Sequence, residues 1–109
     1  MKEFIICAAN HYDDGKKYDH TPVNIKTGFV VCGRRHCNCV AIFAQMNKFI
    51  HTKENIKLQI TEVFGFLTNT NRFVTRKEAY KIAFEADQLI GPNRNCPDND
   101  IGLTSEDLY

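Results

Sequence analysis

TEVFGFLTNTNRFVTRKEA, residues 61–79, contains a strand, a turn, a second strand and the start of a helix, in that order. Residues 61–68 have the aromatic and β-branched content of a strand. The turn falls at residues 69–71, because asparagine tolerates the left-handed backbone that tight turns need. Residues 72–74 form the returning strand. This stretch therefore predicts a hairpin that leads directly into a helix.

The helix that follows has the clearest local signals in the chain. Thr75 and Glu78 have the spacing of a capping box, in which each side chain satisfies a backbone donor at the helix start. A predicted core face repeats at helical spacing: Ala79, Ile82, Ala83, Ala86 and Ile90. Gly91-Pro92 is predicted to end the helix, since glycine suits the left-handed cap and proline cannot continue the ladder.

Four further segments are predicted on either side of this unit. Residues 4–9 are a continuous apolar run typical of a buried strand, and residues 10–24 have loop chemistry. A second strand is expected at 25–33 and a helix at 34–50, with Val40, Phe43, Ala44 and Ile50 on one face. A short helical turn follows at 52–57. The polar tail from residue 93 is expected to dock through Leu103, Leu108 and Tyr109.

Together these elements predict an α+β fold. With 109 residues, 43% hydrophobic and 25% charged, the chain has the size and composition of one globular domain spanning residues 1–109. We expect a mainly antiparallel sheet of about four strands, packed on one face by two principal helices.

The charge balance and the first residues exclude several classes of protein. The net charge is +1, from 14 Lys and Arg against 13 Asp and Glu, so a protein that coats a nucleic acid polymer is not expected. The opening apolar run is too short for a signal peptide or a membrane span. We therefore expect a cytoplasmic protein that does not bind membranes.

The five cysteines leave a metal site open as an alternative. Cys32, Cys37 and Cys39 are close in sequence, and Cys96 or His51 could complete a zinc site. Ordinary reduced thiols are the other interpretation, since no secretion signal accompanies them. We expect no metal and no cofactor, with a zinc-containing partner-binding module as the alternative.

Catalytic motifs are not found in the sequence. It contains no phosphate-cradling glycine loop, no Gly-x-Ser-x-Gly elbow and no His-Glu-x-x-His pair. Asp13 and Asp14 could converge on a metal if they lie in a loop, or they could simply be solvated turn residues. His36 beside Cys37 is a poor nucleophile and base pair, because sequence neighbours seldom face each other. A small nucleotide hydrolase using these aspartates or a histidine remains the alternative to a binding protein.

Two clusters could bind an anion. Arg34, Arg35 and His36 lie where a strand gives way to a helix, and helix N-termini offer free N–H groups to phosphates. The second cluster combines rings and charges that suit a nucleobase beside a phosphate: Phe66, Thr68, Asn71, Arg72 and Arg76. Arg94, in the tail, is a weaker candidate of the same kind. A solvated basic turn and a plain aromatic core are the respective alternatives.

These motifs resemble one phage family along nearly the whole chain. The matching segments are Ala8-Ala9-Asn10, residues 27–31, Gly33-Arg34-Arg35-His36, residues 65–68, residues 71–79 and the ending Ser105-Glu106-Asp107-Leu108-Tyr109. The chain is similar in these to the anti-Thoeris sponge proteins, the first described type of Thoeris anti-defence protein.

The resemblance implies a non-catalytic function. Members of that family sequester glycocyclic ADP-ribose, the signal of TIR-domain enzymes, in pockets at the interface of a homo-oligomer. Some also take cyclic oligonucleotides of CBASS immunity. By motif, the resemblance implies these ligand-binding residues: Arg35, His36, Phe66, Thr68, Asn71, Arg72, Arg94 and Asp107. We therefore expect a homo-oligomeric sponge, a dimer or an assembly of dimers, that binds a cyclic nucleotide signal.

Overall fold

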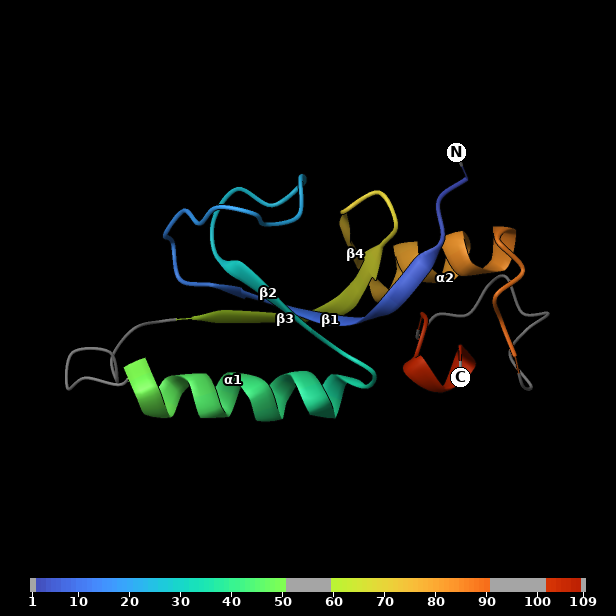
Figure 1. The fold of residues 1–109 in the computed structure, drawn as a ribbon. Helices are drawn as coiled ribbons and strands as arrows, with labels where there is room; N and C mark the ends of the chain where they lie inside the picture. Colours follow the sequence, from blue (N-terminus) through green and yellow to red (C-terminus); the bar gives the residue numbers. More distant parts are fainter. Residues whose placement is uncertain (1, 51–59, 91–101, 109) are drawn as a thin grey trace.

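The sheet has four antiparallel strands in the order β2-β1-β3-β4 within the residues that the structure, a computed structural model, describes: 2–50, 60–90 and 102–108. Its elements are β1 (Ile5–Asp13), β2 (Phe29–Gly33), α1 (His36–Ile50), β3 (Thr61–Thr68), β4 (Phe73–Thr75), α2 (Arg76–Glu85) and the 3-10 helix η2 (Ser105–Asp107). The predicted α+β class, four-stranded antiparallel sheet and two principal helices are confirmed (Figure 1).

Strand β1 is longer than the sequence predicted. The expected strand at 4–9 continues to Asp13, so the loop expected from residue 10 begins only after it. Asn10 and Tyr12 are buried, and this part of β1 pairs with β2 on one side and β3 on the other. Polar residues that suggest a loop are held in a strand here because both neighbouring strands satisfy their backbone groups. Correspondingly, β2 begins at Phe29 rather than at residue 25.

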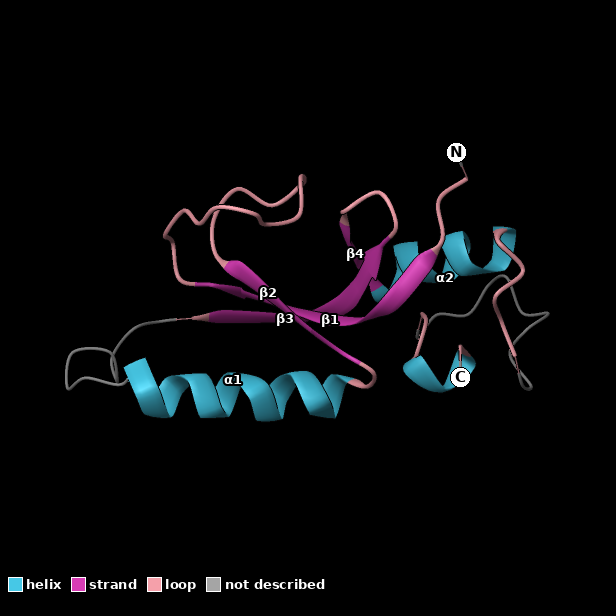
Figure 2. Ribbon diagram, in the orientation of Figure 1, coloured by secondary structure: helices cyan, strands magenta, loops and turns pink. Residues whose placement is uncertain are grey.

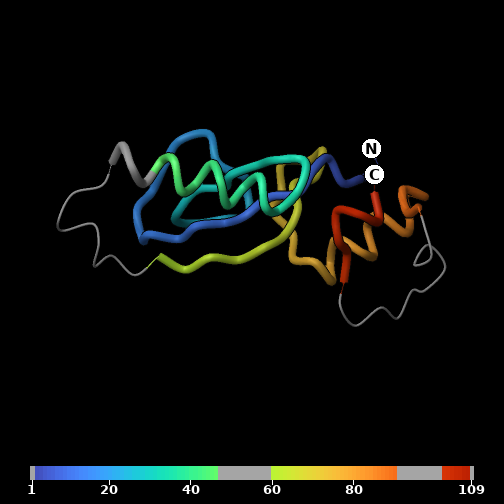
Figure 3. Tube along the Cα trace, turned by 90° about the horizontal axis from the view of Figure 1, so that it is seen from below, coloured from blue at the N-terminus to red at the C-terminus, as the bar shows by residue number. Residues whose placement is uncertain are grey.

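Both helices cover the same face of the sheet. Tyr12 of β1 stacks on Phe43 of α1, with ring centroids 3.8 Å apart. Ala8, on the same face of β1, belongs to a core cluster with Ala79 and Ala83 of α2. Thus α1 packs along one end of this face and α2 along the other (Figures 1 and 3).

The connection from β1 to β2 folds back over the opposite face of the sheet (Figure 2). A ring nitrogen of His11 lies 2.9 Å from the carbonyl oxygen of Thr27, and the His11 ring also contacts Phe73. Gly28 makes this return possible. Its φ is 83°, and a Cβ added there would lie 2.4 Å from the carbonyl oxygen of Tyr12.

The inward face of α1 differs from the predicted one. Cys39, Phe43 and Met46 belong to its core cluster, whereas Val40 is 41% exposed and Ala44 is exposed. The helix is apolar on more than one side, so its periodicity alone does not single out one inward face. At its start, the side-chain oxygen of Asn38 accepts the Arg35 N–H at 3.0 Å.

Helix α2 starts as predicted but ends earlier. The Thr75 hydroxyl accepts the Glu78 N–H at 3.3 Å, which confirms one half of the predicted capping box; the Glu78 carboxylate accepts from Arg72 at 3.5 Å. The helix ends at Glu85, and Asp87 takes a left-handed φ of 57°. The N–H groups of Asp87 and Gln88 bond back to Phe84 and Ala83, which is a Schellman motif without glycine. Because the chain leaves the helix there, Ile90 is 48% exposed instead of facing the core.

Two carboxamide side chains bond backbone groups of the sheet, one at Ile5 of β1, beyond the end of its pairing with β2, and one at Phe73 of the edge strand β4. The Gln88 amide accepts the Ile5 N–H and donates to the Ile5 carbonyl, both at 2.8 Å. The Asn24 amide does the same for Phe73 of β4, at 2.8 and 2.6 Å. Each side chain occupies the position that a neighbouring strand would take at that residue.

The C-terminal segment docks onto the domain as expected. Leu103 is buried in the core cluster of α2, and Leu108 packs against it. The prediction that Gly91-Pro92 ends the second helix was wrong, because α2 already ends at Glu85. Other predictions lie outside the described residues: the turn at 52–57 and the roles of His51, Arg94, Cys96 and Tyr109. Among the helices that the structure describes, none combines the length and apolar character needed to cross a membrane.

Candidate functional site

His36, the first residue of α1, lies where the N-terminal ends of both helices meet the sheet. Its ring is buried, and Nε2 lies 2.7 Å from the carbonyl oxygen of Gly65 in β3. A carbonyl can only accept, so Nε2 carries the proton, and Nδ1 faces the Arg76 guanidinium at 3.5 Å as an acceptor. Burial lowers the pKa of His36, and the Arg76 charge acts in the same direction. His36 is therefore a neutral positioning group between the two helices.

Phe64 supplies the accessible aromatic surface beside His36. The two rings stack with centroids 5.5 Å apart, and the Arg76 guanidinium carbon lies 5.8 Å from the centre of the Phe64 ring. Phe64 is 37% exposed, whereas Phe66, which meets the His36 ring edge-on, is 0% exposed. In this structure Phe66 belongs to the core, and Phe64 is the ring of β3 that a ligand could contact.

The C-terminal segment brings Arg35 and Arg76 to the same place. Arg35 donates to the Ser105 hydroxyl at 3.0 Å and lies 3.9 Å from the Glu106 carboxylate. Arg76 donates to the Leu103 carbonyl at 3.1 Å. The site therefore combines two guanidinium groups, an exposed ring and the start of each helix. Figure 1 shows the start of α1 beside the C-terminal segment.

Asp107, one of the predicted ligand-binding residues, is buried. Its carboxylate accepts from the backbone N–H of Thr104 at 3.0 Å and from the Thr104 hydroxyl at 3.1 Å, which caps η2. Its backbone carbonyl also accepts the Ile90 N–H at 2.7 Å. These contacts hold the segment that carries Ser105 and Glu106 against Arg35.

Arg72 and Thr68 lie in a second group of contacts, organised by Glu3. Arg72 donates through Nε and Nη2 to the two carboxylate oxygens of Glu3, each at 2.8 Å. The Thr68 and Thr70 hydroxyls donate to the same carboxylate. These hydrogen bonds, that of Arg72 first, lower the pKa of Glu3 to about 2. A carboxylate from the chain itself thus occupies the place where a ligand phosphate was expected.

Asn71 has the turn role that its residue type suggested. Its φ is 62°, its N–H donates to the Thr68 carbonyl at 3.0 Å, and its own carbonyl accepts the Val23 N–H at 2.8 Å. Asn71 therefore joins the β3–β4 turn to the β1–β2 connection.

The sequence of this domain matches one known family. The family described as phage T4 y16D protein matches residues 4–109. The chain belongs to this phage family. No curated protein and no solved structure matches it.

Two residues of the His36 site in this y16D-family protein differ from the expectation. Phe64 was not named as a ligand-binding residue, and Arg76 was named in the cluster of Arg72 but lies with His36 instead. Phe64 shares a strand face with Phe66, so alternation alone does not tell which ring remains exposed. Arg76 is the first residue of the capped helix α2, and that position was the available signal. Arg94, which was chosen, lies outside the described residues.

The two aspartates considered for catalysis are engaged in the turn after β1. Asp13 accepts from the Thr27 hydroxyl at 2.7 Å and the Gly15 N–H at 3.0 Å, which lowers its pKa. Asp14 accepts from the Lys16 N–H and from the Tyr18 hydroxyl. These are the contacts of a structured turn.

The cysteines in the described ranges are free thiols. Cys39 is buried, and its thiol faces the Ala8 carbonyl at 3.8 Å, whereas Cys32 and Cys37 are exposed. Interaction with the neighbouring Cys7 thiol lowers the pKa of Cys32. Within residues 2–50, 60–90 and 102–108, no group of three or more His, Cys, Asp or Glu could hold a metal ion.

The Glu3 contacts predict a pH-dependent loss of stability. The folded-state pKa of Glu3, about 2, lies below the ordinary 4.5. The stabilisation that the ionised Glu3 carboxylate provides is therefore fully present above about pH 5 and declines as the pH falls toward 2. The two side chains are 23% and 34% exposed, so we expect Glu3→Gln to lower the free energy of unfolding at pH 7 by about 2 kcal/mol.

Urea denaturation of the wild type and of Glu3→Gln across this pH range measures the effect. Glu85→Gln, at an exposed position of α2, changes the net charge equally and serves as the control. A difference between wild type and Glu3→Gln that stays constant from pH 7 to pH 2 would contradict the assignment.

Proposed function

We propose that this phage protein binds and sequesters a cyclic nucleotide immune signal without cleaving it, in the cytoplasm of the host cell. Glycocyclic ADP-ribose is the proposed ligand, and a cyclic oligonucleotide of CBASS is a second one. The observation that carries the proposal is the stacking of His36 and the approach of Arg76 at the exposed Phe64 ring, with Arg35 next to His36 in the chain.

The charges of this site suit a diphosphate. Guanidinium groups form paired, charge-assisted hydrogen bonds with phosphate oxygens. Arg35 immediately precedes α1 and Arg76 begins α2, so both lie at helix ends where the partial positive charge favours anions. The Ser105 hydroxyl and the Glu106 carboxylate now beside Arg35 are groups that a stronger anion can replace.

The Phe64 ring suits the base of the same ligand. Base stacking on an aromatic side chain contributes about 1–3 kcal/mol and tolerates any base. Arg76, within cation–π distance of Phe64, can contact the ring and the phosphates together. We also propose that the ligand contacts three residues near Glu3: Thr68, Asn71 and Arg72. At Arg72 a ligand phosphate would replace the Glu3 carboxylate.

The contacts of His36 support binding rather than cleavage. Nε2 bonds the Gly65 carbonyl and Nδ1 faces Arg76, so both ring nitrogens are used within the protein. Asp13 and Asp14, the candidate metal ligands of a hydrolase, hold the turn after β1.

We also propose a homo-oligomer, a dimer or an assembly of dimers. The supporting observation is the uncharged, partly apolar surface that α1 leaves exposed. Val40 and Ile42, on the two flanks of the inward face, are each 41% exposed, and residues 36–46 contain no Asp, Glu, Lys or Arg. Apolar side chains exposed along a helix are often covered by a partner. An uncharged helix can pack on its own copy without repulsion.

Recovery of the bound ligand tests the proposal. Purified protein is incubated with glycocyclic ADP-ribose, freed of unbound ligand and heat-denatured, and the released molecule is analysed by mass spectrometry. Intact ligand in near-stoichiometric amount is expected. A chemically altered ligand would show catalysis instead. If the protein retained neither glycocyclic ADP-ribose nor a CBASS cyclic oligonucleotide, sequestration would be refuted. Light scattering of the same samples measures the oligomer.

A further inference from the structure

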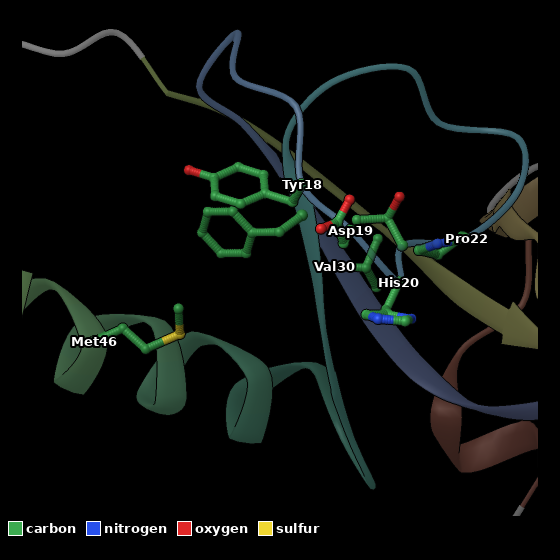
Figure 4. A pocket seen from close by; sticks show the side chains of 8 residues that line it. Tyr18, Asp19, His20, Pro22, Val30 and Met46 are labelled. Atoms are coloured by element: carbon green, nitrogen blue, oxygen red, sulfur yellow. The ribbon is translucent and has the colours of Figure 1, made fainter.

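A hollow of about 490 Å³ lies beside β2, between the β1–β2 connection and α1 (Figure 4). It is lined by residues 18–22 of the β1–β2 connection, by Phe29 and Val30 of β2, and by Met46 of α1. Its volume is in the range of small-molecule sites. Nothing in the proposed binding of a nucleotide at Arg35 and Arg76 uses it.

One wall of the hollow is aromatic and held in place. The Tyr18 ring meets Phe29 edge-on, with centroids 5.6 Å apart, and the Tyr18 hydroxyl donates to Asp14. Phe29 in turn packs on Phe43 of α1, with centroids 6.1 Å apart. Because these contacts fix the two rings of the wall, a planar ligand meets a surface that needs little ordering.

The rim of the hollow is polar and carries no fixed positive charge. Asp19 contributes a carboxylate and Thr21 a hydroxyl, while none of the lining residues is Lys or Arg. His20 lies between them in a left-handed conformation, with φ 61°. A histidine is strained there, and strain of this kind is more common at binding sites. Figure 4 shows its ring directed into the hollow.

We propose that this hollow binds a planar aromatic group that bears a protonated amine. The rings of Tyr18 and Phe29 and the thioether of Met46 take the aromatic body, and the Asp19 carboxylate takes the ammonium group. A phosphate or a carboxylate is excluded, because it would meet Asp19 with no cation on the walls. This chemistry is the opposite of that at Arg35 and Arg76, so the two sites select different ligands.

A matched pair of probes tests the proposal on the full chain. Tryptamine and indole-3-propionate share an aromatic ring system and differ in the sign of their charge. In ¹⁵N-labelled protein, tryptamine is expected to shift the amide resonances of residues 18–21, 29, 30 and 46, with saturation in the millimolar range, and indole-3-propionate is not. Equal shifts with both probes, or shifts with neither, would overturn the proposal.

Two variants separate binding from folding. Asp19→Asn is expected to lower the affinity for tryptamine about fivefold. Glu85→Gln, which changes the net charge equally, should leave this affinity unchanged. His20→Gly removes an imidazole ring that lines the hollow, so it should weaken tryptamine binding. Because glycine also adopts the left-handed backbone without strain, the melting temperature should not fall. Unchanged tryptamine affinity in both variants would also overturn the proposal.

Discussion

Arg76→Ala is expected to weaken the binding of glycocyclic ADP-ribose by about a hundredfold, because a charge-assisted hydrogen bond to phosphate contributes about 1.5–3 kcal/mol. The same guanidinium lies against the Phe64 ring, so the variant also loses the cation that would contact a stacked base. Arg35→Ala, on the other side of the C-terminal segment, is expected to have an effect of the same order. Isothermal titration calorimetry measures both.

Controls are needed because Arg76 also holds the C-terminal segment through the Leu103 carbonyl. Lys77→Ala removes a neighbouring exposed cation of α2 and should leave the affinity unchanged. Arg76→Lys keeps the charge but loses the paired donors, and should fall between wild type and alanine. Thermal melts identify any variant that fails to fold. Wild-type affinity in both alanine variants would show that the ligand does not bind at this place.

Gly65→Ala is expected to destabilise the domain by about 3 kcal/mol. A Cβ built on Gly65 would lie 2.2 Å from the carbonyl oxygen of Val74 and 2.7 Å from the Phe73 ring. Both neighbours belong to β4, which pairs with β3 at this residue, so the added atom must displace the paired strand. Urea denaturation measures the loss.

Gly15→Ala is the matched control for this prediction. Gly15 has a left-handed φ of 80°, but nothing lies within 4 Å of an added Cβ. Only the backbone strain of about 1 kcal/mol is then expected. If Gly65→Ala were no more destabilising than Gly15→Ala, close strand packing at Gly65 would not be the cause.

The parts of the fold that the sequence predicted are those set by local chemistry. Residues 61–79 contain their own turn and cap signals, and the hairpin and the start of α2 were predicted correctly. The second half of β1 was wrongly predicted, because Asn10 and His11 are polar and only the two flanking strands hold them extended. The end of α2 was wrong because Asp87, rather than the more usual glycine, takes the left-handed position.

The candidate site was predictable to a smaller extent. Arg35 and His36 are placed where the strand-to-helix pattern indicated. The partner of Arg72 could not be found from the sequence, because Glu3 lies 69 residues away and only the sheet brings the two together. Likewise, the exposure of Phe64 and the burial of Phe66 depend on where His36 and the two helices pack, which strand alternation does not encode.

The carboxamides of Gln88 and Asn24 have a consequence for solubility. The sequestration proposed above needs as many protein sites as there are signal molecules, and crowded sheets can join through their unpaired backbone groups. At Ile5 and Phe73 the backbone groups that would bond a foreign strand are already bonded by a side chain. Two amide groups thus keep these two residues from templating a second chain.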